Sequence, residues 1–252
     1  MVAFRHTVLV DALPRPWCAD AVGVLLDLAG ASRAEAGRLL LPDGSAVPGT
    51  RLAEGRHLRP GAVYTTEDDA GTVRVRIREW NRHSRLRAAV DVRTPEGHLA
   101  LQVALHGADR LRLLELSGRA QGAGGRPAST AFWGSAVLRG DAWWAAADQG
   151  RAARTPPLHG RLDHRLFRAG IQAVPRPADL GRWEVGVTVT VRGRHLLRPV
   201  AAVVLRVARR RLHRSLAREL GGMAARWNAA LPGLLRHDRD GLRAAVLAEL
   251  RP

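Results

Sequence analysis

Apolar and polar residues alternate along most of the chain, and the period of this alternation changes near the C-terminal end. Over residues 182–193 every second position is apolar, which predicts a half-buried β-strand. After Pro199 the apolar residues recur every three or four positions, which predicts one long amphipathic helix ending near residue 227. Its apolar side carries Ala201, Leu205, Ala208, Leu212, Leu216, Leu220, Met223 and Trp227, and its opposite side carries Arg206, Arg210 and Arg214. We therefore expect one side of this helix to be buried and the other to face water.

The middle of the chain has the same two-residue period over several successive segments. Apolar residues alternate with charged ones between residues 72 and 93, and the alternation continues to about residue 116. The connectors 81–84, 94–97 and 106–109 are short enough to be hairpin loops. These features predict an antiparallel meander with one apolar face and one polar face.

The remaining segments are predicted from breaks in these patterns. Residues 2–10 are typical of a first strand, and Asp20 is a candidate N-cap for a helix over 21–29. A second, short helix is expected over 33–38, and a turn-rich stretch follows it. Glycine and proline crowd residues 117–130, which indicates a linker or loop. Beyond it we expect two more strands, over about 161–174 and 183–191.

Composition narrows the class of protein. The 252 residues include 46% hydrophobic residues, and no apolar run approaches the roughly 20 residues that a membrane helix needs. Residues 1–30 lack the pattern of a signal peptide, and the single cysteine, Cys18, excludes an internal disulfide. We therefore expect a cytoplasmic protein. We also expect the Cys18 thiol to be buried, because free cysteine is among the most buried residue types. The formal net charge is +17, but all 40 basic residues are arginine and they are spread along the chain, which favours compositional bias over a dedicated nucleic-acid surface.

Candidate chemistry is sparse. His159, Asp163 and His164 form only a loose metal-like group, because no further ligand stands at a fixed spacing. His195 and the preceding arginines at 192 and 194 could polarise a ligand carbonyl, although a solvent-exposed loop is the simpler interpretation. We assign no catalytic residue, no metal and no cofactor from the sequence.

The order of these predicted elements resembles the START-like superfamily (SRPBCC, helix-grip), which includes polyketide cyclases, aromatases and lipid-transfer domains. The residues that carry the resemblance are the opening H-T-V-L-V-D-A, the L-L-D-L helix, the strands G-A-V-Y-T-T, V-R-V-R-I-R-E-W and A-D-R-L-R-L-L-E-L, and R-P-V-A-A-V-V-L leading into the last helix. The resemblance implies an α+β helix-grip fold, in which a curved antiparallel sheet wraps around the long C-terminal helix.

The resemblance also implies a domain organisation. One helix-grip domain would cover 1–231, with an inserted segment over 118–157, and a short terminal helix would occupy 232–252. The segment 118–157 and the hairpin region 158–193 depart from the family's pattern, in which the sheet usually passes directly into the last helix. As an alternative, residues 1–68 are also similar to a ubiquitin-like β-grasp unit, with a separate α+β domain over 70–252.

A helix-grip fold implies a cavity between sheet and helix, and such apolar cavities are common ligand sites. The expected lining is Ile77, Val90, Leu101, Val103, Val187, Val189, Leu205 and Leu212; the alternative is that these side chains fill the space completely. The leading functional hypothesis is non-enzymatic binding of a hydrophobic small molecule, lipid or polyketide-like. A cyclase or aromatase is the second hypothesis. A third is weak contact of the arginine-bearing helix side, through Arg206, Arg210 and Arg214, with an acidic membrane or nucleic acid. The ligand and the oligomeric state are not encoded in any motif.

Overall fold

The computed structural model describes residues 2–122, 131–150, 154–194 and 198–251, without the side chains of 198–209. Antiparallel strands and α-helices make up the described chain, which confirms the α+β class. The chain divides into two compact units. Unit 1 comprises Met1–Leu13 and Phe132–Leu234, and unit 2 comprises Pro14–Ala131 and Leu235–Pro252. The predicted domain boundaries at 231 or 68 stay predictions.

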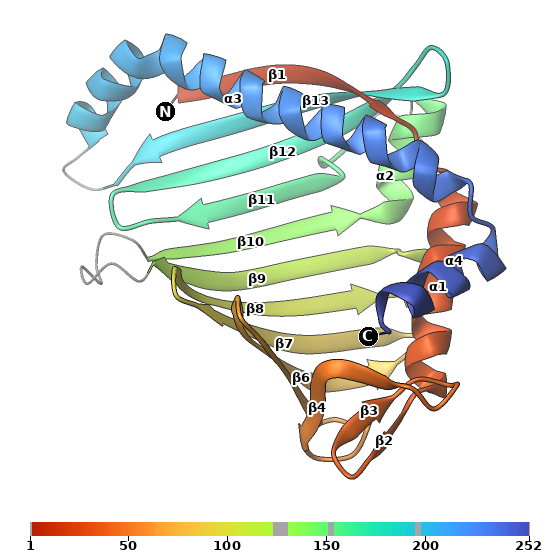
Figure 1. Cartoon of the computed structure of the whole chain (residues 1–252). Coiled ribbons are helices and arrows are strands. Elements are labelled where there is room, and N and C mark those ends of the chain that lie inside the picture. Colours follow the sequence, from red (N-terminus) through yellow and green to blue (C-terminus); the bar gives the residue numbers. More distant parts are fainter. Residues whose placement is uncertain (1, 123–130, 151–153, 195–197, 252) are drawn as a thin grey trace. The chain divides into compact units, whose positions relative to one another are not determined.

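Unit 1 contains an antiparallel sheet with the strand order β1-β13-β12-β11-β10 (Figure 1). Its strands are β1 (Val2–Asp11), β10 (Phe132–Arg139), β11 (Leu158–Asp163), β12 (Phe167–Ala178) and β13 (Arg182–Gly193). The alternation of valines along β13 places every second side chain on the same face, as predicted from the sequence.

The two faces of this sheet differ in polarity. Residues directly opposite one another in an antiparallel pair lie on the same face. One such row is Phe4, Val189, Ile171, Gly160 and Ala136, and the next is His6, Val187, Ala173, Leu158 and Leu138. These rows belong to the apolar face of unit 1. The other face is the polar face of unit 1. One of its rows is Trp133, Asp163, Arg168 and Arg192, and another is Ser135, Arg161, Gly170 and Thr190.

Helix α2 (Gly140–Gln149) packs against the end of this sheet. The Trp143 ring meets the Trp183 ring edge-on, with 6.1 Å between centroids, and Trp183 Nε1 donates to Asp148 at 3.2 Å. Trp144 is 6% exposed and donates its indole N–H to the Leu13 carbonyl at 3.0 Å. Trp143 and Trp144 thus cover the end of a sheet, while Trp133 on β10 is exposed.

Helix α3 (Arg198–Leu235) runs alongside the edge strand β1 (Figure 1). An edge strand has backbone groups without a neighbouring strand to bond. Here helix side chains bond them: Trp227 Nε1 donates to the Asp11 carbonyl at 2.9 Å, and Asn228 Nδ2 donates to the Leu9 carbonyl at 3.2 Å. The Asp11 amide donates to Asn228 Oδ1 at 2.8 Å, and His213 Nε2 bonds the Arg5 carbonyl at 3.1 Å. Polar side chains therefore dock this part of α3 on β1.

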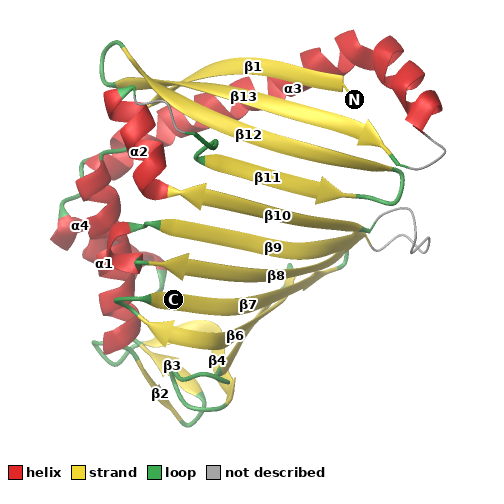
Figure 2. Cartoon of the chain, turned by 180° about the vertical axis from the view of Figure 1, so that it is seen from behind, coloured by secondary structure: helices red, strands yellow, loops and turns green. Residues whose placement is uncertain are grey.

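Unit 2 contains the predicted meander, extended by further strands, in the order β9-β8-β7-β6-β5-β4-β3-β2 (Figure 2). The strands are β2 (Arg33–Glu35), β3 (Arg38–Leu40), β4 (Ala46–Glu54), β5 (Val63–Asp68), β6 (Gly71–Asn81), β7 (Arg85–Thr94), β8 (Gly97–His106) and β9 (Leu113–Gly122). A short 3-10 helix, η1 (Ala108–Arg110), precedes β9. The antiparallel pairing of β6, β7, β8 and β9 confirms the predicted meander.

This sheet also has one apolar and one polar face. The apolar face of unit 2 contains two cross-strand rows. The first is Val75, Val90 and Leu101, and the second is Ile77, Ala88, Val103 and Leu116. The polar face carries hydrogen-bonded pairs of a histidine and a carboxylate. His98 Nε2 lies 2.7 Å from Asp91 Oδ2, and His106 Nε2 lies 2.9 Å from Glu115 Oε2. The hairpin alternation seen in the sequence therefore separates charge from apolar surface.

Two helices of unit 2, α1 (Arg15–Ala31) and α4 (Arg239–Glu249), pack against each other. Val24, Leu28 and Leu242 form their buried contact. Asp238 caps the start of α4 by accepting from the Gly241 amide at 2.8 Å, as aspartate does at helix N-termini. No helix in the described ranges is long and apolar enough to cross a membrane.

Several local predictions were wrong. Residues 33–38 form the β2–β3 hairpin, because Ala36 and Gly37 both take positive φ (47° and 79°), which makes a two-residue turn. Helix α1 begins at Arg15, six residues before the predicted start, because a proline in the first turn loses no intrahelical hydrogen bond. Asp20 is therefore inside the helix and does not cap it.

Two predicted segment limits also need correction. Strand β9 continues to Gly122, into the predicted linker, because small residues there let β8 approach closely. A Cβ at Gly118 would lie 2.2 Å from the Ala100 carbonyl oxygen. The predicted strand 161–174 is two strands, separated by a turn in which the His164 amide donates to the Phe167 carbonyl at 2.9 Å. Residues 123–130 of the predicted linker lie outside the described residues.

The docking of α3 on β1 predicts the effect of replacing Asn228. The change Asn228→Ala removes two hydrogen bonds to the β1 backbone and leaves the Asp11 amide without its partner. We expect a loss of about 1–2 kcal/mol in the free energy of unfolding, measured by denaturant titration. Hydrogen exchange at the Asp11 amide should accelerate.

The matched control is Arg226→Ala, two positions earlier on the exposed part of α3. It should change the unfolding free energy by less than about 0.5 kcal/mol. Equal effects of the two substitutions would contradict the docking role of Asn228.

Candidate functional site

The predicted cavity-lining residues fall on apolar surfaces in both units. Val187 and Val189 stand two positions apart on β13 and share the apolar face of unit 1. Ile77, Val90, Leu101 and Val103 share the apolar face of unit 2, with Val90 directly opposite Leu101. Leu212 lies on α3, and the side chain of Leu205 lies outside the described residues. Their role as a ligand lining stays a prediction.

Burial varies over these surfaces. Ile77 and Val187 are each 6% exposed, whereas Val90, Leu101, Val103 and Val189 are half-buried. A filled core would leave such side chains fully covered. Solvent therefore reaches some cross-strand rows of the apolar faces but not others.

The most open part of the apolar face of unit 1 was not among the predicted lining residues. Ile171 on β12 is 38% exposed and stands in the same cross-strand row as Val189. Leu162 on β11 is 37% exposed and belongs to the adjoining row. Residue alternation could have placed both positions on this face if the strand break at 164–166 had been recognised, but it does not give their exposure.

Helix α3 adds a second exposed apolar surface to unit 1. The residues that contact β1 or are best covered lie on one side of the helix: His213, Leu220, Trp227, Asn228 and Leu231. Leu212, Met223 and Leu234 lie on the adjoining side. These three, here called the apolar strip of α3, are 39–57% exposed. Docking to β1 therefore leaves the apolar strip largely uncovered within unit 1.

One ionisable residue lies on the apolar face of unit 1. His6 is opposite Val187 in the β1–β13 pair, so its imidazole is on the same face as the valines. The His213 ring meets it edge-on, with 6.2 Å between centroids. This histidine pair joins the sheet to α3 and places proton-carrying groups beside apolar side chains.

In unit 2, Ser32, His57 and Tyr64 form a hydrogen-bonded chain. Tyr64 Oη accepts from the Leu58 amide at 2.8 Å and lies 2.7 Å from His57 Nδ1, and His57 Nε2 lies 3.1 Å from Ser32 Oγ. Ser32 Oγ donates to the Ala29 carbonyl at 2.7 Å, at the end of α1. The Ser32 hydroxyl proton is donated to this carbonyl, so His57 is not placed to accept it as a general base. The three hydrogen-bonded side chains therefore cap the end of α1. Burial raises the pKa of Tyr64, which keeps its phenol protonated.

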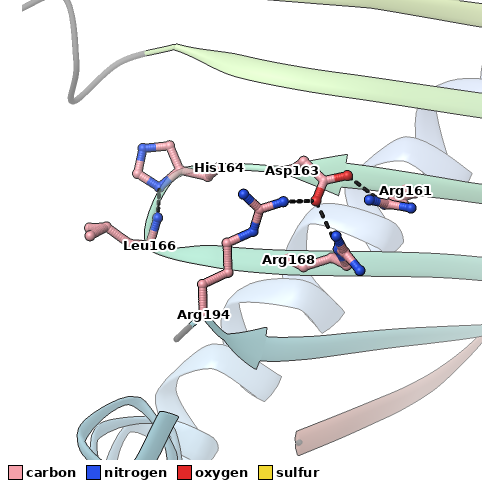
Figure 3. Close-up of polar contacts among 6 residues, drawn as sticks. All are labelled: Arg161, Asp163, His164, Leu166, Arg168 and Arg194. Atoms are coloured by element: carbon pink, nitrogen blue, oxygen red, sulfur yellow. Dashed lines mark hydrogen bonds and ion pairs between the residues drawn. The ribbon is translucent and has the colours of Figure 1, made fainter. Parts of the chain in front are cut away.

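On the polar face of unit 1, three arginines surround one aspartate (Figure 3). Asp163 is only 9% exposed. Its Oδ2 accepts from Arg161 Nε, and its Oδ1 accepts from Arg168 Nε at 2.8 Å and from Arg194 Nη2 at 2.5 Å. We call Arg161, Arg168 and Arg194 the arginine cluster. Hydrogen bonds from the cluster, that of Arg161 first, hold the pKa of Asp163 well below its usual range.

These contacts determine whether the loose group of His159, Asp163 and His164 could bind a metal ion. Both Asp163 oxygens are held by guanidinium groups, so they are not available to a cation. His164 stacks on Phe132 at 4.9 Å between ring centroids, and its Nδ1 accepts from the Leu166 amide at 3.3 Å. Within the described ranges, no group of three or more His, Cys, Asp or Glu could hold a metal ion.

Other predicted features can be placed individually. Cys18 is buried, and burial raises the pKa of its thiol, in keeping with the expected inert role. Arg210 and Arg214 are exposed on α3, while the side chains of Arg206 and His195 lie outside the described residues. Contact of this helix side with an acidic surface stays a prediction. Arg194, expected in a solvent loop, is instead part of the arginine cluster.

Comparisons with known proteins add little. No protein-family model and no curated protein matches the chain. Among solved structures, the chain is similar to Ara h 8.0201 over 98% of this chain and 99% of that one, with 10% identity and a TM-score of 0.16. It is also similar to DynU16, a protein of the dynemicin biosynthetic locus, over 75% of this chain and 86% of that one, with 13% identity and a TM-score of 0.19. TM-scores this low carry no argument, so membership of the START-like superfamily stays a prediction.

The buried carboxylate of Asp163 predicts a pH-dependent stability. Because its folded-state pKa is depressed, the ionised form stabilises the fold above its ordinary pKa of 3.8, and this contribution is lost as the pH falls through the lower folded-state value. The change Asp163→Asn should therefore cost about 2 kcal/mol at pH 7, a figure that allows for solvent screening of the half-exposed arginines.

The measurement is denaturant unfolding of both proteins between pH 7 and pH 2. The difference in unfolding free energy should shrink once the pH falls below 3.8. A difference that stays constant over this range would show that the carboxylate is not ionised in the cluster.

Proposed function

We propose that this protein binds a hydrophobic small molecule and that binding needs no chemical step. One observation carries the proposal: unit 1 presents exposed apolar side chains on its sheet, Ile171 and Leu162, and on its helix, the apolar strip of α3. The half-buried apolar face of unit 2 supports it. A ligand would lie between sheet and helix, with Val187, Val189 and Leu212 among its contacts.

The physical gain from such binding is large enough to matter. Removing apolar surface from water contributes roughly 25 cal/mol per Å², or about 1.5–3 kcal/mol for a leucine-sized side chain that becomes fully covered. Soluble proteins seldom leave several large apolar side chains together in water unless the surface has a partner. A lipid-like or polyketide-like molecule matches this surface because it can cover several rows at once.

The proposed architecture is the helix-grip arrangement. The antiparallel sheets, their apolar faces and the two-sided helix α3 support it. In this proposal Val187, Val189 and Leu212 face a ligand in unit 1, and the apolar face of unit 2, with Ile77, Val90, Leu101 and Val103, is a second apolar surface available to a hydrophobic ligand.

The first test is native mass spectrometry of the protein purified from its own host. We expect a co-purifying hydrophobic molecule that raises the mass of the folded protein and is released by organic solvent. Protein that is empty, and that also fails to bind the uncharged fluorophore Nile red, would overturn the proposal.

Matched substitutions locate the binding surface. Leu212→Asn and Ile171→Asn place an amide on the two exposed apolar surfaces and should each weaken Nile red binding about tenfold, which corresponds to about 1.4 kcal/mol. Leu180→Asn is the control, because Leu180 is 89% exposed at the turn between β12 and β13, away from both apolar surfaces. It should change the dissociation constant less than about twofold. Equal losses in all three variants would contradict this assignment.

A second candidate function, ring closure of a bound polyketide-like chain, is favoured by the position of His6. An imidazole on an apolar face could move a proton during enolisation and cyclisation. A poly-β-ketone incubated with wild-type protein should then cyclise faster than with the His6→Gln variant, while both bind Nile red equally. Equal cyclisation rates would leave binding as the function.

A further inference from the structure

The arginine cluster is assembled from three separate segments of unit 1. Arg161 lies on β11 and Arg168 on β12, while Arg194 directly follows β13 (Figure 3). Asp163, itself nearly buried, fixes one nitrogen of each guanidinium group. The three side chains are therefore pre-positioned, which lowers the entropic cost of binding a further group.

The cluster carries more positive charge than Asp163 can neutralise. Three guanidinium groups face one carboxylate, and among the described residues no other acidic side chain pairs with any of the three. Arg192 adds to the excess, because it is directly opposite Arg168 in the β12–β13 pair and like charges so placed repel. A bound anion of charge −2 would relieve this repulsion.

The geometry leaves hydrogen-bond donors for such an anion. Arg161 and Arg168 use their Nε atoms on Asp163, and no other described residue forms a hydrogen bond or ion pair with their terminal Nη atoms. Their side chains are 48% and 50% exposed, and that of Arg194 is 32% exposed. Paired Nη donors match the oxygens of a tetrahedral oxyanion better than a point charge does.

We propose that the arginine cluster binds a phosphate group in its dianionic form. The excess charge matches a phosphate monoester, and the open position on a sheet face admits either a free phosphate compound or the headgroup of a phosphate-bearing lipid. This site lies on the polar face of unit 1, so the proposal does not depend on ligand binding at the apolar face.

The experiment is isothermal titration of the full-length protein at low salt with two probes. The first is inorganic phosphate, and the second is vesicles of phosphatidylcholine with and without phosphatidic acid. Arg168→Gln and Arg194→Gln should each weaken the binding of the active probe about tenfold. Arg176→Gln, a control on the same strand and the same exposed face, should change it less than twofold.

Circular dichroism of each variant establishes that it is folded, and either cluster variant suffices if the other does not fold. Binding of inorganic phosphate alone supports the proposal with a free phosphate compound as ligand. Binding that requires phosphatidic acid supports it with a lipid headgroup as ligand. Failure of wild-type protein to bind either probe would overturn the proposal. An equal loss of binding in Arg176→Gln would also overturn it, because such a loss would show only diffuse charge attraction.

Discussion

The hydrogen bonds between α3 and the edge strand β1 determine which surfaces unit 1 leaves open. Trp227, Asn228 and His213 direct their polar atoms to the β1 backbone, and these contacts fix the side of the helix that faces the strand. A helix rotation that covered the apolar strip would break them and leave edge-strand groups unpaired. The uncovered apolar strip therefore follows from how the edge of the sheet is satisfied.

The same alternation that builds each sheet also separates two kinds of surface. In both units every second residue lies on an apolar face, and the intervening residues carry the charges. In unit 2 these polar side chains occur in pairs, such as Arg51 with Glu67, and exposed ion pairs of this kind contribute little to stability. In unit 1 the arginine cluster is unbalanced, with a single carboxylate at its centre. The apolar faces and the arginine cluster thus present two chemically different candidate sites in one chain.

Much of the architecture was predictable from period alone. The meander, the face shared by Val90 and Leu101, and the strand containing Val187 all follow from residue alternation, which depends only on local geometry. The β2–β3 hairpin was missed because its turn depends on a positive φ at Ala36, a residue without turn preference. The arginine cluster could not be predicted, since Arg161, Arg168 and Arg194 meet only through strand pairing across more than thirty residues of sequence. The exposure of Ile171 likewise depends on what packs above it, which no local pattern encodes.

A single hydrophobic molecule bound by unit 1 would lie against both the apolar strip of α3 and the open rows of the apolar face. Photolabelling with an alkyl chain that carries a diazirine, followed by mapping of modified residues by mass spectrometry, can detect this. We expect modification at Met223 or Leu212 on the helix and at Ile171 or Val189 on the sheet, with competition by an unlabelled alkyl chain. Modification that is spread over the polar face, or that an unlabelled competitor does not reduce, would show that no such molecule is bound there.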